Sequence, residues 1–145
     1  MKRILVATDG SESAHRALDY AAQRALHEGA ELLIVNVVGG YGLPGSVLQK
    51  FTTGQHAWLK ELLGSLSAST LAEAQERAHE LGVRTIRLES REGEVASTLV
   101  DIAREQQADA LVVGKRGAGQ AAGLLLGSVS HKLVSLSPLP VMVIP

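Results

Sequence analysis

The sequence predicts an α/β fold with a doubly wound parallel sheet, and two observations lead to this prediction. Five short apolar runs alternate with segments whose apolar residues recur every three to four positions. The runs are nearly continuous, as expected for strands that helices cover on both faces. The alternation extends through all 145 residues, so we expect one domain over 1–145 with right-handed crossovers. The expected strands are Ile4–Ala7, Leu32–Val38, Val83–Leu88, Ala110–Val113 and Val141–Ile144.

Helices are expected between these strands. Ser11 is a suitable N-cap for the first helix, and Gly29 is a suitable end because glycine readily adopts the left-handed conformation there. The glycine-rich stretch 39–45 is expected to be a loop. The signal then weakens, and the periodicity predicts two helices, over about Gln55–Leu63 and Ser67–Leu81.

The second half of the chain continues the alternation. The third strand carries Arg84 and Arg87, which favours an edge position in the sheet. Apolar spacing predicts a helix around Val95–Ala103 and another from about Ser128 to Ser135. Pro140 stands at the start of the last strand, where a missing backbone donor is tolerated.

Composition excludes several classes of protein. The net charge of −1 argues against a nucleic-acid-binding protein that relies on bulk positive charge. The absence of cysteine excludes a disulfide framework and a thiol nucleophile, and the five histidines lack zinc-ligand spacing. No apolar run is long enough to cross a bilayer, and the first residues do not resemble a secretory signal. We therefore expect a cytoplasmic protein without membrane insertion.

Glycine-rich motifs follow three of the expected strands. Asp9-Gly10-Ser11 follows the first strand, Gly39-Gly40 follows the second, and Gly114-x2-Gly117-x9-Gly127-Ser128 follows the fourth. In a doubly wound sheet, ligands bind beyond the carboxyl ends of the strands. Glycines allow close approach of the backbone to a phosphate, and free N–H groups at a helix start favour an anion. The last motif therefore favours phosphate binding over turn formation alone, and Asp9 is either a ligand contact or an Asx-turn residue.

The chain resembles the universal stress protein family over essentially its whole length. The likeness rests on Ile4–Ser11, on Asn36-Val37, on the spaced glycines Gly114, Gly117 and Gly127 with Ser128, and on Pro140–Ile144. The glycine spacing is typical of the ATP-binding branch of that family. The resemblance implies a five-stranded parallel sheet of order 3-2-1-4-5. It also implies a homodimer that pairs through the last strand, Val141–Ile144.

The resemblance also implies roles for individual residues. Asp9 would lie beside the adenosine, the backbone of Val37 would meet the adenine edge, and the end of the fourth strand would line the ribose. The sequence departs from the family in having Lys115-Arg116 between the first two glycines and Ala118 after the second. These basic residues would then meet the phosphate charge. The expected nucleotide-binding residues are Ala7, Asp9, Val37, Val113, Gly114, Arg116, Gly117, Gly127, Ser128, Val129 and Ser130.

The expected function is that of an ATP-binding stress-response or regulatory module, with Mg²⁺ accompanying the nucleotide and a protein partner that is unknown. Occupancy would order the loop 115–126 and change the surface presented to that partner. We expect no catalytic residues, because the sequence contains neither a G-x-S-x-G elbow nor a recognisable general base. Two alternatives stay open: a nucleotide-free dimeric interaction module of the same fold, and a slow ATP-hydrolysing enzyme that uses the same cleft.

Overall fold

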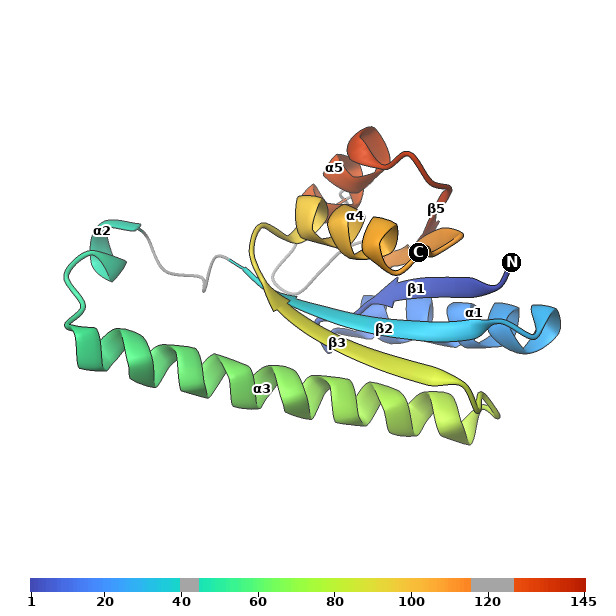
Figure 1. Cartoon of the computed structure of the whole chain (residues 1–145), viewed down its shortest axis with the longest axis horizontal. Helices are drawn as coiled ribbons and strands as arrows, with labels where there is room; N and C mark the ends of the chain where they lie inside the picture. The colour runs from blue at the N-terminus through green and yellow to red at the C-terminus, as the bar shows by residue number, and fades with distance from the viewer. Residues whose placement is uncertain (40–44, 116–126) are drawn as a thin grey trace.

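The computed structural model describes residues 1–39, 45–115 and 127–145, and its central feature is one parallel sheet (Figure 1). The strand order is β3-β2-β1-β4-β5, and every adjacent pair is parallel. The predicted fold class and the strand order implied by the family resemblance are confirmed. The elements in chain order are β1 (Arg3–Ala7), α1 (Glu12–Glu28), β2 (Glu31–Val38), α2 (Gly45–Leu48), α3 (Thr53–Glu80), β3 (Ile86–Glu92), α4 (Val95–Glu105), β4 (Ala110–Gly114), α5 (Ser128–Leu136) and β5 (Val141–Ile144).

Helices cover both faces of the sheet. Successive residues of a strand point to opposite faces. Ile4 and Val6 accordingly pack with α1 and α3 in what we call the first core, whereas Leu5 packs with α4 and α5 in the second core. Figure 1 shows α1 and α3 on one side of the strands and α4 and α5 on the other.

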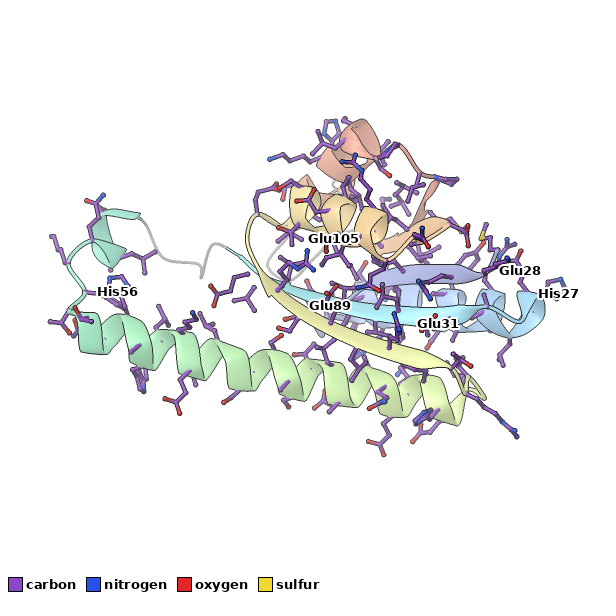
Figure 2. The ribbon with its side chains drawn as sticks, in the orientation of Figure 1. His27, Glu28, Glu31, His56, Glu89 and Glu105 are labelled. Carbon is purple, nitrogen blue, oxygen red and sulfur yellow. The ribbon has the colours of Figure 1, made fainter. Side chains whose placement is uncertain are left out.

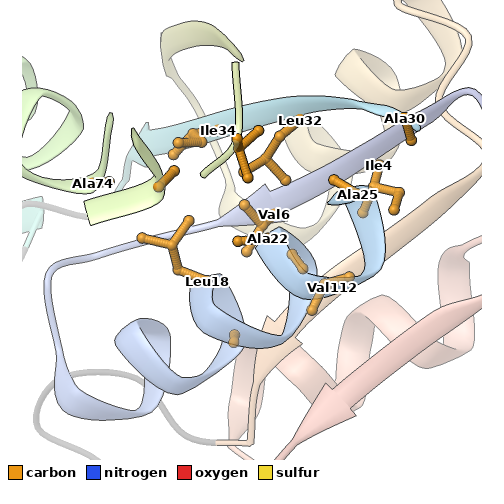
Figure 3. Packing of buried hydrophobic residues seen from close by; sticks show 14 of the residues in the cluster. Ile4, Val6, Leu18, Ala22, Ala25, Ala30, Leu32, Ile34, Ala74 and Val112 are labelled. Carbon is orange, nitrogen blue, oxygen red and sulfur yellow. The ribbon is translucent and has the colours of Figure 1, made fainter. Parts of the chain in front are cut away.

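Alanine fills much of the first core (Figure 3). Ala17, Ala21, Ala22 and Ala25 of α1 are at most 2% exposed. Small side chains let the helix lie close to the β-branched and leucine side chains of the strands, and dense packing gives the interior its cohesion. A core of this kind needs no aromatic residue, in agreement with the aromatic content of 3%.

The ends of α1 are formed as the sequence predicts. The Ser11 hydroxyl accepts a hydrogen bond from the backbone N–H of Ala14 at 3.2 Å. Gly29 ends the helix with φ 65°, and its N–H reaches carbonyls of the last turn. Both expectations are confirmed, and together they fix where β1 leads into the helix and where the helix turns back to β2.

The prediction of two separate helices over 55–63 and 67–81 is wrong, because α3 is continuous. Thr52 starts it with a capping box in which its hydroxyl accepts from the N–H of Gln55 and its own N–H donates to the Gln55 side chain. Gly64, which lies between the two predicted helices, is where an added Cβ would meet nothing within 4 Å. A glycine inside a helix costs only about 1 kcal/mol relative to alanine, so the helix runs through it.

The two halves of α3 differ in burial. Ser67, Leu71, Ala74 and Ala78 are buried against the sheet, whereas no residue over 53–66 is buried. In Figure 1 the first half of α3 extends past the end of the sheet, and Figure 2 places His56 there, far from Glu28 and Glu31. The first half is therefore held by the cap and by the helix itself rather than by a core.

Other boundaries differ modestly from the prediction. The third strand is Ile86–Glu92 rather than Val83–Leu88, because Val83 is buried in the first core and its N–H donates to Ala78 at the end of α3. Its predicted edge position is confirmed. The short helix α2 was not predicted, and most of the expected loop 39–45 lies outside the described residues. Among the helices that the structure describes, none has the length and hydropathy needed to cross a membrane.

Candidate functional site

A cavity of about 310 Å³ opens at the carboxyl ends of β1, β2 and β4. The strand order explains its place. The chain leaves β1 towards α1 on one face, and it leaves β4 on the way to α5 on the other, so the two connections diverge. The cavity is lined by Ala7, Thr8, Asp9, Ala14, Val37, Gly39, Val95, Leu99, Val113, Gly114, Gly127, Ser128, Val129 and Ser130.

Nine of the eleven residues that the sequence analysis assigns to a binding site line this one cavity. They come from four separate segments of the chain, which the parallel topology brings together. The other two, Arg116 and Gly117, lie outside the described residues. The fold thus assembles a single concave surface from the strand ends that carry the motifs.

Five of the lining residues were not predicted from the sequence. Val95 and Leu99 are one turn apart on the inner face of α4, and their apolar spacing is the same as that of any core residue. Only the position of α4 beside the ends of β2 and β4 distinguishes them. Gly39 could have been predicted, because it belongs to the glycine pair that follows the second strand. The full set that was missed is Thr8, Ala14, Gly39, Val95 and Leu99.

The turn after β1 is held by local hydrogen bonds. The Asp9 carboxylate accepts from the N–H of Ser11 at 2.9 Å, which is the Asx-turn contact that the sequence allowed. The Thr8 hydroxyl accepts from the N–H of Gly10 at 3.2 Å, and Gly10 has φ 82°. Glycine suits this left-handed conformation. The turn therefore places Asp9 at the wall of the cavity and leads directly into α1.

The start of α5 faces the same cavity. Gly127 is the N-cap and provides no side-chain capping bond, and the first helical hydrogen bond runs from His131 to its carbonyl. The N–H groups of the first turn, Ser128 to Ser130, have no acceptor within the helix and carry the positive end of its dipole. Ser128 is exposed and lines the cavity. This end of the cavity is suited to an anion.

Ser130 serves the backbone rather than the open cavity. Its buried hydroxyl lies 2.9 Å from the carbonyl oxygen of Lys115 and 3.1 Å from that of Gly127. The N–H of Gly127 also donates to the Lys115 carbonyl, at 2.7 Å. These bonds hold the start of α5 to the end of β4. Ser130 thereby fixes the position of the first-turn N–H groups.

Gly114 is explained by packing against α1. A Cβ at this position would lie 2.8 Å from both the carbonyl carbon and the carbonyl oxygen of Ser13. Backbone atoms cannot move aside cheaply, so the end of β4 and the start of α1 can approach this closely only with glycine here. The first glycine of the motif is thus required by the fold, whatever the cavity binds.

Charge is distributed unevenly along the sheet. Asp9 is the only ionisable side chain among the described residues that line the cavity. At the opposite, amino-terminal end of the strands, Arg3 and Arg87 both pair with Glu31, at 2.7 and 3.0 Å (Figure 2). The described part of the cavity therefore offers an apolar wall, one carboxylate and backbone N–H groups.

One ion pair joins the two helices that border the cavity. Glu94 caps α4 by accepting from the N–H of Ser97 at 2.7 Å, and it also pairs with Lys132 of α5 at 2.7 Å. The hydrogen bond from Lys132, with those from the side chain and backbone of Ser97, lowers the pKa of Glu94 to about 2. This pair ties the start of α4 to the helix whose N-terminus faces the cavity.

Comparison with known proteins gives consistent matches over the full chain. The model of the universal stress protein family matches residues 1–145. Universal stress protein YxiE of Bacillus subtilis is 32% identical over 145 residues, which cover 98% of this chain and 97% of that protein. Universal stress protein Rv1636 of Mycobacterium tuberculosis is 32% identical over 149 residues, which cover 99% of this chain and 95% of that protein.

Solved structures agree with these sequence matches. A universal stress protein crystallised in complex with cAMP has 30% identity and a TM-score of 0.75, and the match covers 99% of this chain and 97% of that one. UspA from Lactobacillus plantarum superposes with a TM-score of 0.82 at 24% identity over 99% of this chain and 97% of that one. At 24% identity, the match to UspA shows a common fold and nothing more.

The close approach at Gly114 gives a first prediction. Gly114→Ala is expected to lower the free energy of unfolding by about 1–3 kcal/mol, because the new Cβ would overlap backbone atoms of Ser13. Gly64→Ala is the matched control, since its Cβ would meet nothing and alanine favours the helix, so it should add about 0.5–1 kcal/mol. Urea unfolding followed by circular dichroism measures both. Equal effects of the two substitutions would contradict this packing role.

The pKa of Glu94 gives a second prediction. A carboxylate whose pKa is lowered by folding stabilises the protein above its unfolded pKa, here the ordinary 4.5, and loses that effect as the pH falls towards about 2. Glu94→Gln should therefore lower the free energy of unfolding by about 1 kcal/mol at neutral pH, through the lost ion pair and weaker cap. Plotted against pH, the free energies of unfolding of the two proteins should converge between about pH 5 and pH 2. Curves that stay parallel over this range would show that Glu94 is not the titrating group.

Proposed function

Because the chain belongs to the universal stress protein family, we propose that it binds an adenine nucleotide, ATP with Mg²⁺, in the cavity at the carboxyl ends of β1, β2 and β4. The observation that carries the proposal is the composition of the cavity lining. It combines an apolar wall with the N-terminus of α5. A nucleotide has the same two parts, an apolar base and an anionic phosphate. The related structure that contains cAMP also supports an adenine ligand.

The apolar wall suits the base and the ribose. Val37, Val95 and Leu99 contribute apolar surface to the lining, and Val113 with Gly114 lines the cavity from the end of β4. A base in this position would be held by dispersion contacts and by the strand-end backbone near Val37, rather than by aromatic stacking. Backbone groups would read the edge of the adenine.

The phosphates would lie against the first turn of α5. Its N–H groups would donate to phosphate oxygens, assisted by the helix dipole, and the Ser128 hydroxyl is placed to add a further bond. Mg²⁺ would accompany ATP, since this ion is usually held by phosphates, water and one or two carboxylates. Asp9 is the carboxylate available in the described lining. The described residues contain no group of three or more metal-ligating side chains.

We propose a binding and regulatory role rather than an enzymatic one. In the described lining, no ionisable group other than Asp9 is available as a general base, and its carboxylate already accepts a bond from the turn. Nucleotide occupancy would instead bias the conformation of the chain around the cavity. Such a bias requires that the nucleotide bind one conformation more tightly than another.

A substitution at the start of α5 tests the proposed binding. After removal of any bound nucleotide, calorimetric titration with Mg-ATP should show about one site per chain. Ser128→Asp should weaken ATP binding about tenfold, equivalent to about 1.4 kcal/mol, because the new carboxylate repels phosphate. The same carboxylate favours the N-terminus of a helix, so stability should not fall. Affinity and stability are thus expected to change independently.

Ser135→Asp is the matched control, because it adds the same charge in the last turn of α5, away from the cavity lining. Its ATP affinity should equal that of the unaltered chain. A folded protein that binds no adenine nucleotide would overturn the proposal and favour a nucleotide-free interaction module.

We further propose that two copies pair through β5, the last strand of the described sheet. The carbonyl of Pro140 accepts from Leu111 of β4, and the carbonyl of Ile144 accepts from Lys115, the residue after β4. Backbone groups alternate in direction along a strand, so those of Val143 face the outer edge. An outer edge with such groups is a template for pairing with another chain.

Sedimentation tests this pairing. The unaltered chain should sediment at about twice 15.3 kDa. Val143→Pro removes an outward donor without removing a bond to β4, and it should shift the population to a monomer. Circular dichroism checks that the variant stays folded. A folded Val143→Pro dimer would place the interface elsewhere.

A further inference from the structure

A chain of hydrogen bonds connects three elements of the fold to Thr8, which lines the cavity. The Ser67 hydroxyl of α3 donates to the Asn36 side-chain oxygen at 2.6 Å and lies 2.7 Å from the Ser90 hydroxyl of β3. The Asn36 side-chain nitrogen donates to the carbonyl of Thr8 at 2.7 Å. Asn36 belongs to β2, and Thr8 follows β1. The chain of bonds thus connects α3, β2 and the edge strand β3 to Thr8, the residue before Asp9.

The direction of these bonds follows from counting protons. A hydroxyl has one proton, and Ser67 gives its proton to Asn36. The proton between the two serines therefore comes from Ser90. The carbonyl at the other end can only accept, so the amide nitrogen of Asn36 must face Thr8 and the amide oxygen must face Ser67. The Thr8 carbonyl thereby fixes which way the Asn36 amide faces, and the Ser67 hydroxyl holds the amide oxygen by donating to it.

Asn36 completes the attachment of Thr8 to β2. The regular ladder between β1 and β2 ends where the N–H of Thr8 donates to the carbonyl of Val35 at 2.9 Å. The carbonyl of Thr8 is then held by Asn36. Both polar backbone atoms of Thr8 are bonded to β2, so the peptide that leads into Asp9 has a fixed orientation.

The residues on either side of this attachment form two walls of the cavity. Asp9 follows Thr8 and Val37 follows Asn36. Both residues line the cavity, and Val37 belongs to the apolar wall proposed for the base. Thr8 is 5% exposed and Ser67 is 3% exposed, so water cannot readily replace the bonds they make. A change at Asn36 would therefore alter the distance between the walls rather than a direct ligand contact.

From this arrangement we infer that Asn36 is a positioning residue for the adenine end of the cavity, and that Ser67 of α3 acts through it. The inference rests on the proposed nucleotide binding. Aspartate in place of Asn36 could still accept from Ser67, but its second oxygen would face the carbonyl of Thr8 and repel it. The side chain at position 36 must donate to Thr8 and accept from Ser67, and an amide can do both.

Three variants test the inference by calorimetric titration with Mg-ATP at neutral pH. Asn36→Asp should weaken binding about tenfold, through the lost bond and the new repulsion at Thr8. Ser67→Ala should weaken binding about threefold, because the amide oxygen of Asn36 loses the donor that holds it in place. Ser90→Ala is the matched control. Ser90 is exposed and donates only to Ser67, so its loss should change the affinity less than twofold.

A double variant separates positioning from general damage to the cavity. Asn36 is assigned to the base end and Ser128 to the phosphate end, so the fold-changes of Asn36→Asp and Ser128→Asp should multiply in the double variant. A cavity disordered by Asn36→Asp would lose the effect of Ser128→Asp. Unfolding followed by circular dichroism establishes that each variant is folded at the titration temperature. Ser67→Ala keeps the test decisive if Asn36→Asp does not fold.

The outcomes distinguish the two proposals. If the unaltered chain does not bind Mg-ATP, the proposed function fails. If the unaltered chain binds and both Asn36→Asp and Ser67→Ala bind equally well, the inference is overturned while the proposed function stands. Fold-changes that do not multiply would assign Asn36 a structural role only and would also overturn the inference.

Discussion

The structure depends on the reversal of winding direction between β1 and β4. From β1 the sheet grows through β2 to β3, and from β4 it grows outward through β5 on the other side. The connections on the two sides therefore cover opposite faces, and a crevice is left where they part. Every lining segment is positioned by this reversal. The turn after β1, the end of β2 and the start of α5 are separated by tens of residues in the chain but meet at one edge.

Close packing makes this arrangement rigid. The alanines of α1 allow it to lie low on the sheet, and Gly114 lets the end of β4 pass against the backbone of Ser13. Ser130 then joins the start of α5 to Lys115, and Glu94 with Lys132 joins α5 to α4. The cavity is thus framed by residues whose main contacts are with the protein itself, as preorganised binding requires.

Much of the fold could be predicted from local patterns, because buried strands and amphipathic helices have distinct periods. The caps of α1 at Ser11 and Gly29 and the edge position of β3 followed from the same reasoning. The strand order came only from the family resemblance. The continuity of α3 was missed because a weak apolar pattern suggests a break that the capping box and the packed second half outweigh.

The site was predictable where a motif follows a strand and unpredictable where a helix supplies the wall. Asp9, Val37 and Ser128 stand in motifs, whereas Val95 and Leu99 have the spacing of ordinary core residues. The link between Asn36 and Ser67 spans 31 positions, and no local pattern signals a contact between two polar residues so far apart. Arg116 and Gly117 lie outside the described residues.

The exposed first half of α3 has a consequence for spectroscopy. Trp58, the only tryptophan of the chain, stands on this half and is 61% exposed. Its fluorescence emission therefore reports on the part of α3 before Ser67 and not on the two cores. A melting curve recorded by tryptophan emission therefore follows local fraying of this half-helix, whereas the far-ultraviolet signal follows the whole fold. A difference between the two midpoints would measure how independently the projecting segment unfolds.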